Sequence, residues 1–240
     1  MEKYFEKIYL NGFQTCLKEL EKAIWDEKKK FIITANPETL MIGQKDKMFD
    51  KVLKSDDVTI VPDGIGVVKA AKLLGYDVKE RVTGVELSKK LLEFANLYQK
   101  SIYLFGAKEE VIRLLIDKIK KEYPNIIIKG YESGYVPEKD VVMDKIVKCE
   151  PDIVLVALGI PQQELLIDRY YEEAKKGIFI GVGGSFDVLS GTKKRAPQIF
   201  IKLNLEWLYR IVKEPKRIKR FVQSNIIFVM KIMLLRRKVK

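Results

Sequence analysis

One carboxylate is a candidate general base in this sequence of 240 residues, which contains no histidine. Asp63 follows the apolar run Val58–Val61 and Pro62, and glycines come soon after it. Without histidine there is no Ser-His-Asp triad and no imidazole-ligated zinc, so proton abstraction falls to Asp or Glu. Aspartate is also a common N-cap residue, and the alternative is that Asp63 caps a helix predicted over Val67–Leu74.

Residues suited to binding sugars and phosphates occupy similar positions elsewhere. Thr34 and Asn36 end an apolar run and precede Pro37, which suits the first turn of a helix. Their hydroxyl and amide could orient a sugar, or could cap that helix. Arg81 lies just before a helix predicted to begin near residue 86. A helix N-terminus with a nearby arginine can bind a phosphate, although an ordinary surface arginine is the alternative.

A glycine-rich turn, Gly181–Asp187, contains Gly183 and Gly184 and could let the backbone approach a nucleotide. Asp187 could hold a ribose hydroxyl or a base edge. The turn is not the GxGxxG dinucleotide fingerprint, and no GxxxxGK[ST] motif is present. No Asp-x-Asp pair is present to hold a nucleotide-bound divalent ion, so we expect neither a metal nor a cofactor. Cationic side chains and amides would then bind the phosphates.

An α/β fold would bring these residues together, because short β-branched runs alternate with helix-length segments. This alternation predicts a Rossmann-like parallel sheet flanked by helices, with ligands at the carboxyl ends of the strands. The predicted strands are Phe31–Thr34, Val58–Val61, Ser101–Phe105, Ile126–Lys129, Asp152–Ala157 and Gly177–Val182. The predicted helices include Glu38–Leu53, Val67–Leu74, Glu138–Cys149 and Gln162–Lys176.

The C-terminal fifth of the chain carries all of its net charge. Residues 193–240 hold 15 Lys or Arg against Glu206 and Glu214, a balance of +13, whereas the whole chain has 45 against 33. These charges alternate with aromatic and aliphatic residues, which predicts two helices joined at Pro215. We therefore divide the chain into an α/β domain, 1–192, and a basic, amphipathic helical appendage, 193–240. Such an appendage suits an anionic surface, either membrane or nucleic acid, although a solvated helix packed on the body is the alternative.

Other features favour a cytoplasmic protein that touches a membrane without crossing it. The longest apolar run, Ile226–Leu235, is interrupted by Lys231 and is shorter than the roughly 18–20 residues of a membrane span. The N-terminus does not resemble a secretory signal. Cys16 and Cys149 are far apart and match no metal-ligand spacing, which suits two buried thiols in a reducing compartment.

Seven motifs, taken in order, resemble those of the WecG/TagA/CpsF glycosyltransferases over about residues 31–220. The resemblance implies transfer of a sugar from a UDP-sugar to a polyprenyl-diphosphate-linked sugar at the cytoplasmic membrane face. The motifs are Thr34–Glu38, Pro62–Gly66, Glu80–Gly84, Leu104–Ala107, Val156–Glu164, Gly181–Asp187, and Arg195–Pro197 with Leu205–Arg210.

Within this family the sequence is most similar to enzymes of wall teichoic acid synthesis. That similarity implies an inverting, metal-independent transfer of N-acetylmannosamine from its UDP donor. The acceptor would be the 4-hydroxyl of GlcNAc in undecaprenyl-diphosphate-GlcNAc, giving a β1,4 linkage. A family relative using UDP-N-acetylmannosaminuronic acid or UDP-glucose is one alternative. A nucleic-acid-binding module that uses the basic appendage is an alternative of another class.

The resemblance also assigns roles to residues. Asp63 would be the base, with Thr34 and Asn36 near the transferred sugar. The C-terminal segment would bind the membrane surface and bring arginines to the leaving diphosphate, and the chain could form a homo-oligomer. Substrate binding is assigned to Arg81, Gln163, Gly183, Gly184, Asp187, Arg195, Arg210, Arg217 and Arg220.

Overall fold

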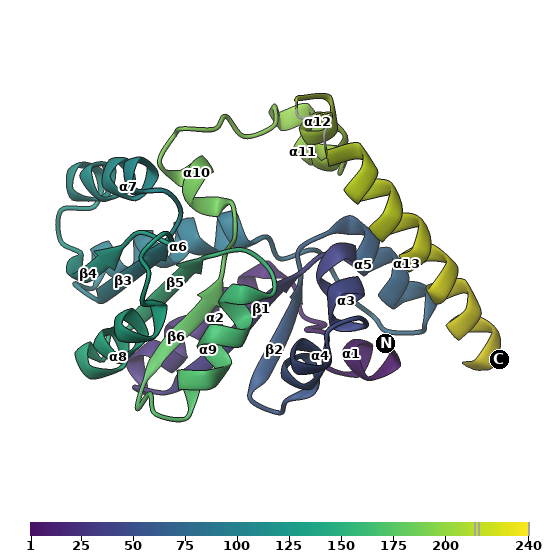
Figure 1. Ribbon diagram of the computed structural model, residues 1–240, viewed down its shortest axis with the longest axis horizontal. Helices are drawn as coiled ribbons and strands as arrows, with labels where there is room; N and C mark the ends of the chain where they lie inside the picture. The colour runs from purple at the N-terminus through teal and green to yellow at the C-terminus, as the bar shows by residue number, and fades with distance from the viewer. Residues whose placement is uncertain (214, 216, 240) are drawn as a thin grey trace.

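A six-stranded, wholly parallel sheet forms the centre of the protein (Figure 1). The computed structural model describes residues 1–213, 215 and 217–239, with the backbone alone for residues 202, 210, 217, 219, 220, 238 and 239. The sheet order is β2-β1-β6-β5-β3-β4. The strands are β1 (Lys29–Ala35), β2 (Val58–Pro62), β3 (Ser101–Gly106), β4 (Ile127–Glu132), β5 (Ile153–Ala157) and β6 (Gly177–Gly181).

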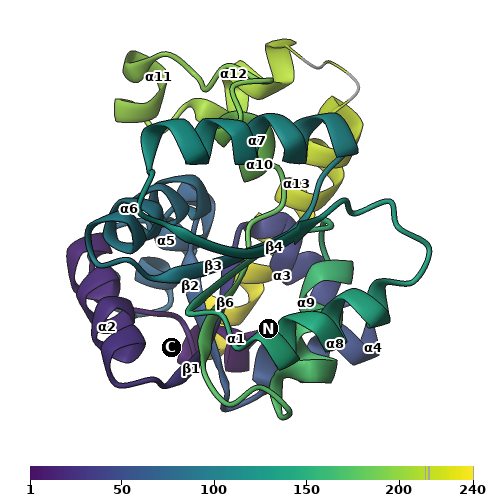
Figure 2. The ribbon, with the colours of Figure 1, turned by 90° about the vertical axis from the view of Figure 1, so that its left-hand side faces the viewer.

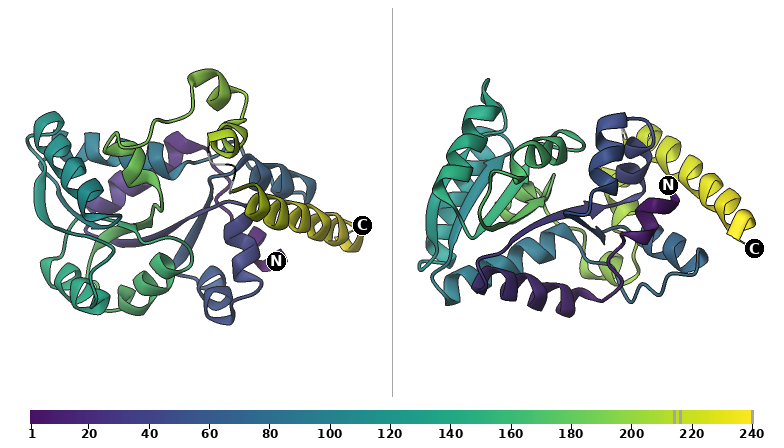
Figure 3. Two further views of the ribbon diagram at one scale, coloured as in Figure 1. Left: turned by 45° about the horizontal axis from the view of Figure 1, so that its top comes forward. Right: turned by 90° about the horizontal axis from the view of Figure 1, so that it is seen from below.

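Helices cover both faces of this sheet, which confirms the predicted α/β, Rossmann-like fold (Figures 2 and 3). The helices are α1 (Glu2–Glu6), α2 (Phe13–Trp25), α3 (Pro37–Gly43), α4 (Lys47–Lys54), α5 (Ile65–Leu73), α6 (Gly84–Leu97), α7 (Glu109–Glu122), α8 (Lys139–Cys149), α9 (Gln162–Tyr171), α10 (Ser185–Leu189), α11 (Gln198–Lys202), α12 (Glu206–Lys213) and α13 (Arg217–Val239). One core cluster packs α3, α4, α5, α8, α9 and α13 on one face of the sheet, and a second packs α2, α6, α7 and α10 on the other. The central strands β5 and β6 are buried throughout, because both of their faces meet a helix layer.

The helix expected over Glu38–Leu53 is two helices, so that part of the prediction is wrong. Helix α3 ends at Gly43, and α4 begins only at Lys47. Between them Asp46 has an extended backbone, and its carboxylate accepts hydrogen bonds from the amides of Met48 and Phe49. This N-cap starts a second helix in a new direction.

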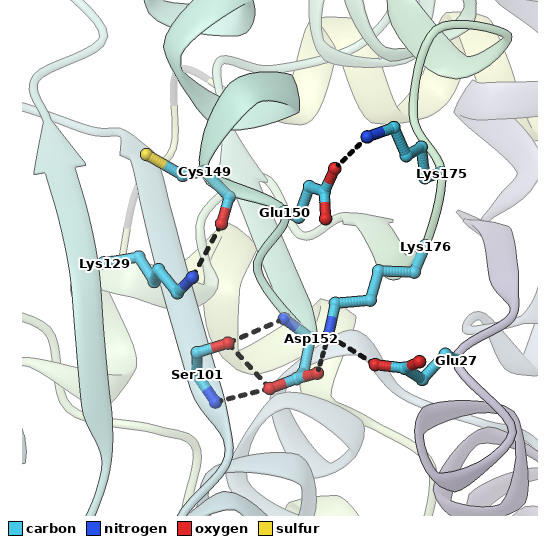
Figure 4. A network of polar contacts seen from close by, with 8 residues as sticks. All are labelled: Glu27, Ser101, Lys129, Cys149, Glu150, Asp152, Lys175 and Lys176. Carbon is cyan, nitrogen blue, oxygen red and sulfur yellow. Dashed lines mark hydrogen bonds and ion pairs between the residues drawn. The ribbon is translucent and has the colours of Figure 1, made fainter.

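A polar cluster ties together the amino ends of three strands (Figure 4). The Asp152 carboxylate accepts hydrogen bonds from the Ser101 amide at 2.8 Å and the Ser101 hydroxyl at 2.6 Å. Lys176 lies 3.1 Å from both Asp152 and Glu27. Burial acts to raise the pKa of Asp152, but the Ser101 hydrogen bonds and Lys176 outweigh it and hold that pKa below its ordinary value. The cluster therefore lies at the end of the sheet opposite the carboxyl ends of the strands.

The C-terminal segment lies over the carboxyl end of the sheet and then runs back along the body. In Figures 1 and 2, α11 and α12 lie beyond α10, which follows β6. Pro215 falls between α12 and α13, as predicted. Helix α13 contacts α3 and α5 and buries Phe228 and Ile232 in their core cluster. Among the described residues, no helix is long and apolar enough to cross a membrane.

Candidate active site

The site forms where neighbouring strands β1 and β6 send their chains to opposite faces of the sheet. Helix α3, which follows β1, packs in one core cluster, whereas α10, which follows β6, packs in the other. Parallel α/β sheets open a crevice at such a point, at the carboxyl ends of the strands. The predicted residues Thr34 and Asn36 come from the β1 side, and the Gly181–Asp187 turn comes from the β6 side.

Thr34 and Asn36 hold the β1 side of this crevice in shape. The buried Thr34 hydroxyl donates a hydrogen bond of 2.9 Å to the carbonyl of Gly181, which joins the ends of β1 and β6. Asn36 is the N-cap of α3, and its side-chain oxygen accepts from the amide of Thr39 at 3.1 Å in a reciprocal capping box. The capping interpretation of Asn36 is therefore confirmed, and any contact with sugar would fall to its amide nitrogen.

Asp63 is held at the N-terminus of a different helix from the one that follows it. The N-cap of α5 is Gly64, without a side-chain cap, so Asp63 does not cap that helix. Instead, one Asp63 oxygen accepts a hydrogen bond of 3.2 Å from the amide of Gly84, the first residue of α6. A Cβ placed on Gly84 would lie 3.3 Å from the Thr34 side chain, which places Asp63 and Thr34 around one glycine. The positive end of α6 favours the ionised carboxylate that a general base requires.

Gln163 lies beneath the surface of the site and joins two turns. Its side chain is 1% exposed, and its oxygen accepts from the amides of Gly159 and Gly183, each at 3.1 Å. Gly183 has a positive φ of 49°, and no heavy atom lies within 4 Å of a Cβ built there. Because Gly183 has no side chain, the space beside it is open, and a ligand can approach the backbone of this turn closely. Gln163 therefore fixes the position of this turn through the hydrogen bond that it accepts from the Gly183 amide.

Two ion pairs join the C-terminal segment to the start of α6. Arg195 donates to Glu86 at 2.9 Å, and Arg81 lies 3.8 Å from Glu206 of α12. The side chains of Arg81 and Glu206 are 17% and 12% exposed, so Arg81 is not an ordinary surface arginine. Two of the arginines predicted to bind substrate thus lie at one helix N-terminus, close to the residue that holds Asp63.

Glu86 takes part in this arrangement but is not among the residues predicted for the site. Thr83 is the N-cap of α6: its hydroxyl accepts from the amide of Glu86 at 3.3 Å and donates to the Glu86 carboxylate at 2.9 Å, an arrangement that the Thr-x-x-Glu pattern could have indicated. Burial acts to raise the pKa of Glu86, but hydrogen bonds from Thr83 and Arg195 outweigh it and lower that pKa. Glu86 is therefore a stable anion that holds Arg195 beside the site. Glu164, also missed, is completely buried next to Gln163.

Of the remaining predicted residues, the structure describes the side chains of some but not of others. Asp187 lies in α10, 4.0 Å from Lys193, and Gly184 is the N-cap of that helix. The side chains of Arg210, Arg217 and Arg220 lie outside the described residues. Among the described side chains no three Cys, Asp or Glu groups gather as a metal site. A hollow of about 500 Å³ between α2 and α6 is lined by none of the predicted site residues, so we place the site in the crevice instead.

Comparison with known proteins identifies the family of the chain. The model of the glycosyl transferase WecG/TagA/CpsF family matches residues 7–240. An N-acetylglucosaminyldiphosphoundecaprenol N-acetyl-beta-D-mannosaminyltransferase of Bacillus subtilis (strain 168) is 46% identical over 89% of this chain and 84% of its own length. The protein of the same name from Staphylococcus aureus (strain MW2) is 37% identical over 88% and 82%. The chain belongs to the WecG/TagA/CpsF family of glycosyltransferases.

Proposed function

We propose that this chain transfers N-acetylmannosamine from UDP-N-acetylmannosamine to the 4-hydroxyl of GlcNAc in undecaprenyl-diphosphate-GlcNAc. The observation that carries the proposal is its 46% identity, over 89% of the chain, to a relative named for such a transfer. The reaction would be an early step in making the linkage unit of wall teichoic acid.

The proposed chemistry is a single displacement with inversion. Asp63 takes the proton of the acceptor 4-hydroxyl while that oxygen forms a bond to the anomeric carbon of the donor sugar. The bond from that carbon to the diphosphate oxygen breaks, and UDP leaves with the electron pair. Asp63 suits the role of base because it is a carboxylate held in place beside the crevice by the amide of Gly84.

Charge on the departing UDP would be balanced by cations and amides. Arg81 and Arg195 lie at the N-terminus of α6, and Gly183 and Gly184 open the turn where we place UDP. Arg210, Arg217 and Arg220 are the further candidates from the C-terminal segment. Preorganised donors of this kind stabilise charge that develops in a transition state. We therefore propose a metal-independent reaction whose rate stays within about twofold of normal in excess EDTA.

The acceptor carries a lipid, so the enzyme must meet a bilayer. We propose that the appendage, residues 193–240, docks the α/β domain, 1–192, on the inner face of the plasma membrane. Lysine and arginine near an anionic surface contribute about 1 kcal/mol each. Large apolar side chains are also exposed along α13, among them Val222, Ile226, Ile227, Val229, Met230, Met233 and Leu234.

The decisive experiment measures turnover of a lipid-diphosphate-GlcNAc analogue against a panel of UDP-sugars. The proposal expects UDP-N-acetylmannosamine to be the preferred donor. Preference for UDP-N-acetylmannosaminuronic acid or UDP-glucose would instead support a relative that makes another surface polysaccharide. No transfer from any donor to this acceptor would overturn the proposal.

A second experiment addresses the basic appendage. The chain is mixed with anionic vesicles in a flotation assay and, in parallel, with duplex DNA in a mobility-shift assay. We expect flotation with the vesicles, weakened by salt. Retention on DNA without vesicle binding would favour the nucleic-acid alternative and contradict the membrane role.

A further inference from the structure

A buried glutamate lies directly under the proposed donor site, and no cationic side chain that the structure describes is paired with it. Glu164 is 0% exposed, and one of its oxygens, Oε2, has no hydrogen-bond partner among the described residues. Its other oxygen accepts a hydrogen bond of 2.7 Å from the side-chain nitrogen of Gln163. Burial raises the pKa of Glu164 to about 7. An apolar residue of similar size would fill this space at a lower free-energy cost, so packing alone does not account for the glutamate.

The contact with Glu164 decides which end of the Gln163 amide faces the turns. A glutamine amide has one accepting end and one donating end, and the two can exchange by rotation. Because Gln163 donates to Glu164, its oxygen faces the amides of Gly159 and Gly183. Rotation of the amide would set two N–H donors against two N–H donors and would leave both turns without an acceptor.

Gly181 shows how closely this pair fits under the turn. A Cβ at Gly181 would lie 2.7 Å from the Gln163 side-chain nitrogen and 2.9 Å from Glu164 Oε1. The same glycine accepts the hydrogen bond from Thr34 through its carbonyl oxygen. The pair therefore packs against the backbone that begins the Gly181–Asp187 turn and that meets the end of β1.

We infer that Glu164 is a positioning residue for the donor: it holds the Gln163 amide in the orientation that fixes the Gly159 and Gly183 turns for UDP. This inference rests on the proposed function, because it takes the Gly181–Asp187 turn to receive UDP. Glu164 itself touches no substrate, and it acts through the hydrogen bond that it accepts from Gln163.

Calorimetric titration with UDP tests this role, with melting temperature as the measure of folding. Glu164→Leu removes the acceptor, and we expect UDP to bind about tenfold more weakly, the loss that corresponds to one hydrogen bond. Its melting temperature should not fall, because the change removes a buried carboxyl group. Glu164→Gln keeps an oxygen that can accept from Gln163, so it should retain UDP affinity within about threefold. Glu173→Leu, an exposed site just beyond the same helix, is the matched control.

The double variant Gln163→Met with Glu164→Leu isolates the coupling. If Glu164 acts through Gln163, the double variant should lose no more affinity than Gln163→Met alone. Should Glu164→Leu fail to fold, Gln163→Met carries the test, and unchanged UDP affinity would overturn the inference. Full affinity in a folded Glu164→Leu, an equal loss in Glu164→Gln, or additive losses in the double variant would each overturn it too. Absence of UDP binding in the unaltered chain would instead overturn the proposed function, on which the inference depends.

Discussion

At the scale of single residues, Asp63 owes its position to a helix that begins 21 positions later in the chain. The amide of Gly84 donates to its carboxylate, and the Thr34 side chain lies close to the same glycine. The sequence pointed to Asp63 by elimination, since no histidine is present. The partner could not be predicted, because Asp63 and Gly84 are joined only by the folded arrangement of β2 and α6.

Replacing Asp63 by Asn tests its role as the base. The amide can still lie beside the α6 N-terminus, so UDP affinity should stay near normal. Turnover should fall by about 10²–10⁴-fold, because asparagine cannot accept the proton of the acceptor hydroxyl. Steady-state kinetics with UDP titration measures both, and Asp117→Asn on the exposed side of α7 is the control. Near-normal turnover in Asp63→Asn would remove Asp63 as the base.

Glu164 makes the stability of the fold depend on pH in an unusual direction. Burial raises its pKa from 4.5 to about 7 in the folded protein. Between these values the unfolded chain loses the proton while the folded chain keeps it, so rising pH destabilises the fold. The resulting loss in the free energy of unfolding reaches about 3 kcal/mol above pH 7 and is absent below pH 4.

Glu164→Gln should abolish this dependence. The free energy of unfolding of the variant minus that of the unaltered chain should increase by about 2–3 kcal/mol when the pH is raised from 5 to 8. Urea denaturation at the two pH values measures the difference, and Glu173→Gln provides a surface control. A constant difference between variant and unaltered chain would contradict a raised pKa at Glu164.

At the scale of elements, all six strands were predictable from their short β-branched runs. Strands β3, β5 and β6 are buried throughout, whereas the edge strand β4 is exposed or half-buried along its whole length. The break between α3 and α4 was not predicted, although Gly43 and the polar run Gln44–Lys47 interrupt the apolar pattern there and Asp46 caps the new helix. Helices α1 and α2 were not predicted either. The spacing of Leu17, Leu20 and Ile24, which α2 buries, nevertheless fits an amphipathic helix.

The polar cluster at the amino ends of the strands should be a major source of stability. Asp152→Ala leaves the Ser101 amide and Lys176 without their shared acceptor, and we expect a loss of about 2–4 kcal/mol. Asp152→Asn can still accept from Ser101 and should lose less. Urea denaturation at pH 7 compares the variants, and UDP affinity should be unchanged, because the cluster lies at the opposite edge of the sheet. Equal stability of Asp152→Ala and the unaltered chain would contradict this role.

At the scale of the whole molecule, the described part of the C-terminal segment contacts the body both near the site and along α13. Near the site, Arg195 pairs with Glu86 and Arg81 pairs with Glu206. Farther on, α13 buries Phe228 and Ile232 against the layer that contains α3 and α5. The charge pattern indicated a separate basic appendage, whereas these buried contacts depend on tertiary structure that no local pattern reveals. The segment that we expect to meet the membrane therefore also contacts the helix N-terminus that positions Asp63.

Removing the chain from Ala196 onward tests whether docking and transfer share this segment. The truncated chain retains Arg195 but loses Glu206 and the proposed arginines of the appendage, so we expect loss of both vesicle binding and transfer to the lipid acceptor. The α/β sheet should stay folded with a lower melting temperature, because Phe228 and Ile232 no longer cover α3 and α5. A matched variant, Glu206→Gln, keeps the segment and removes the carboxylate charge that pairs with Arg81. We expect it to bind vesicles normally, since anionic lipid meets the cations of the segment. A truncated chain that transfers sugar at the normal rate in detergent would show that the appendage contributes docking alone.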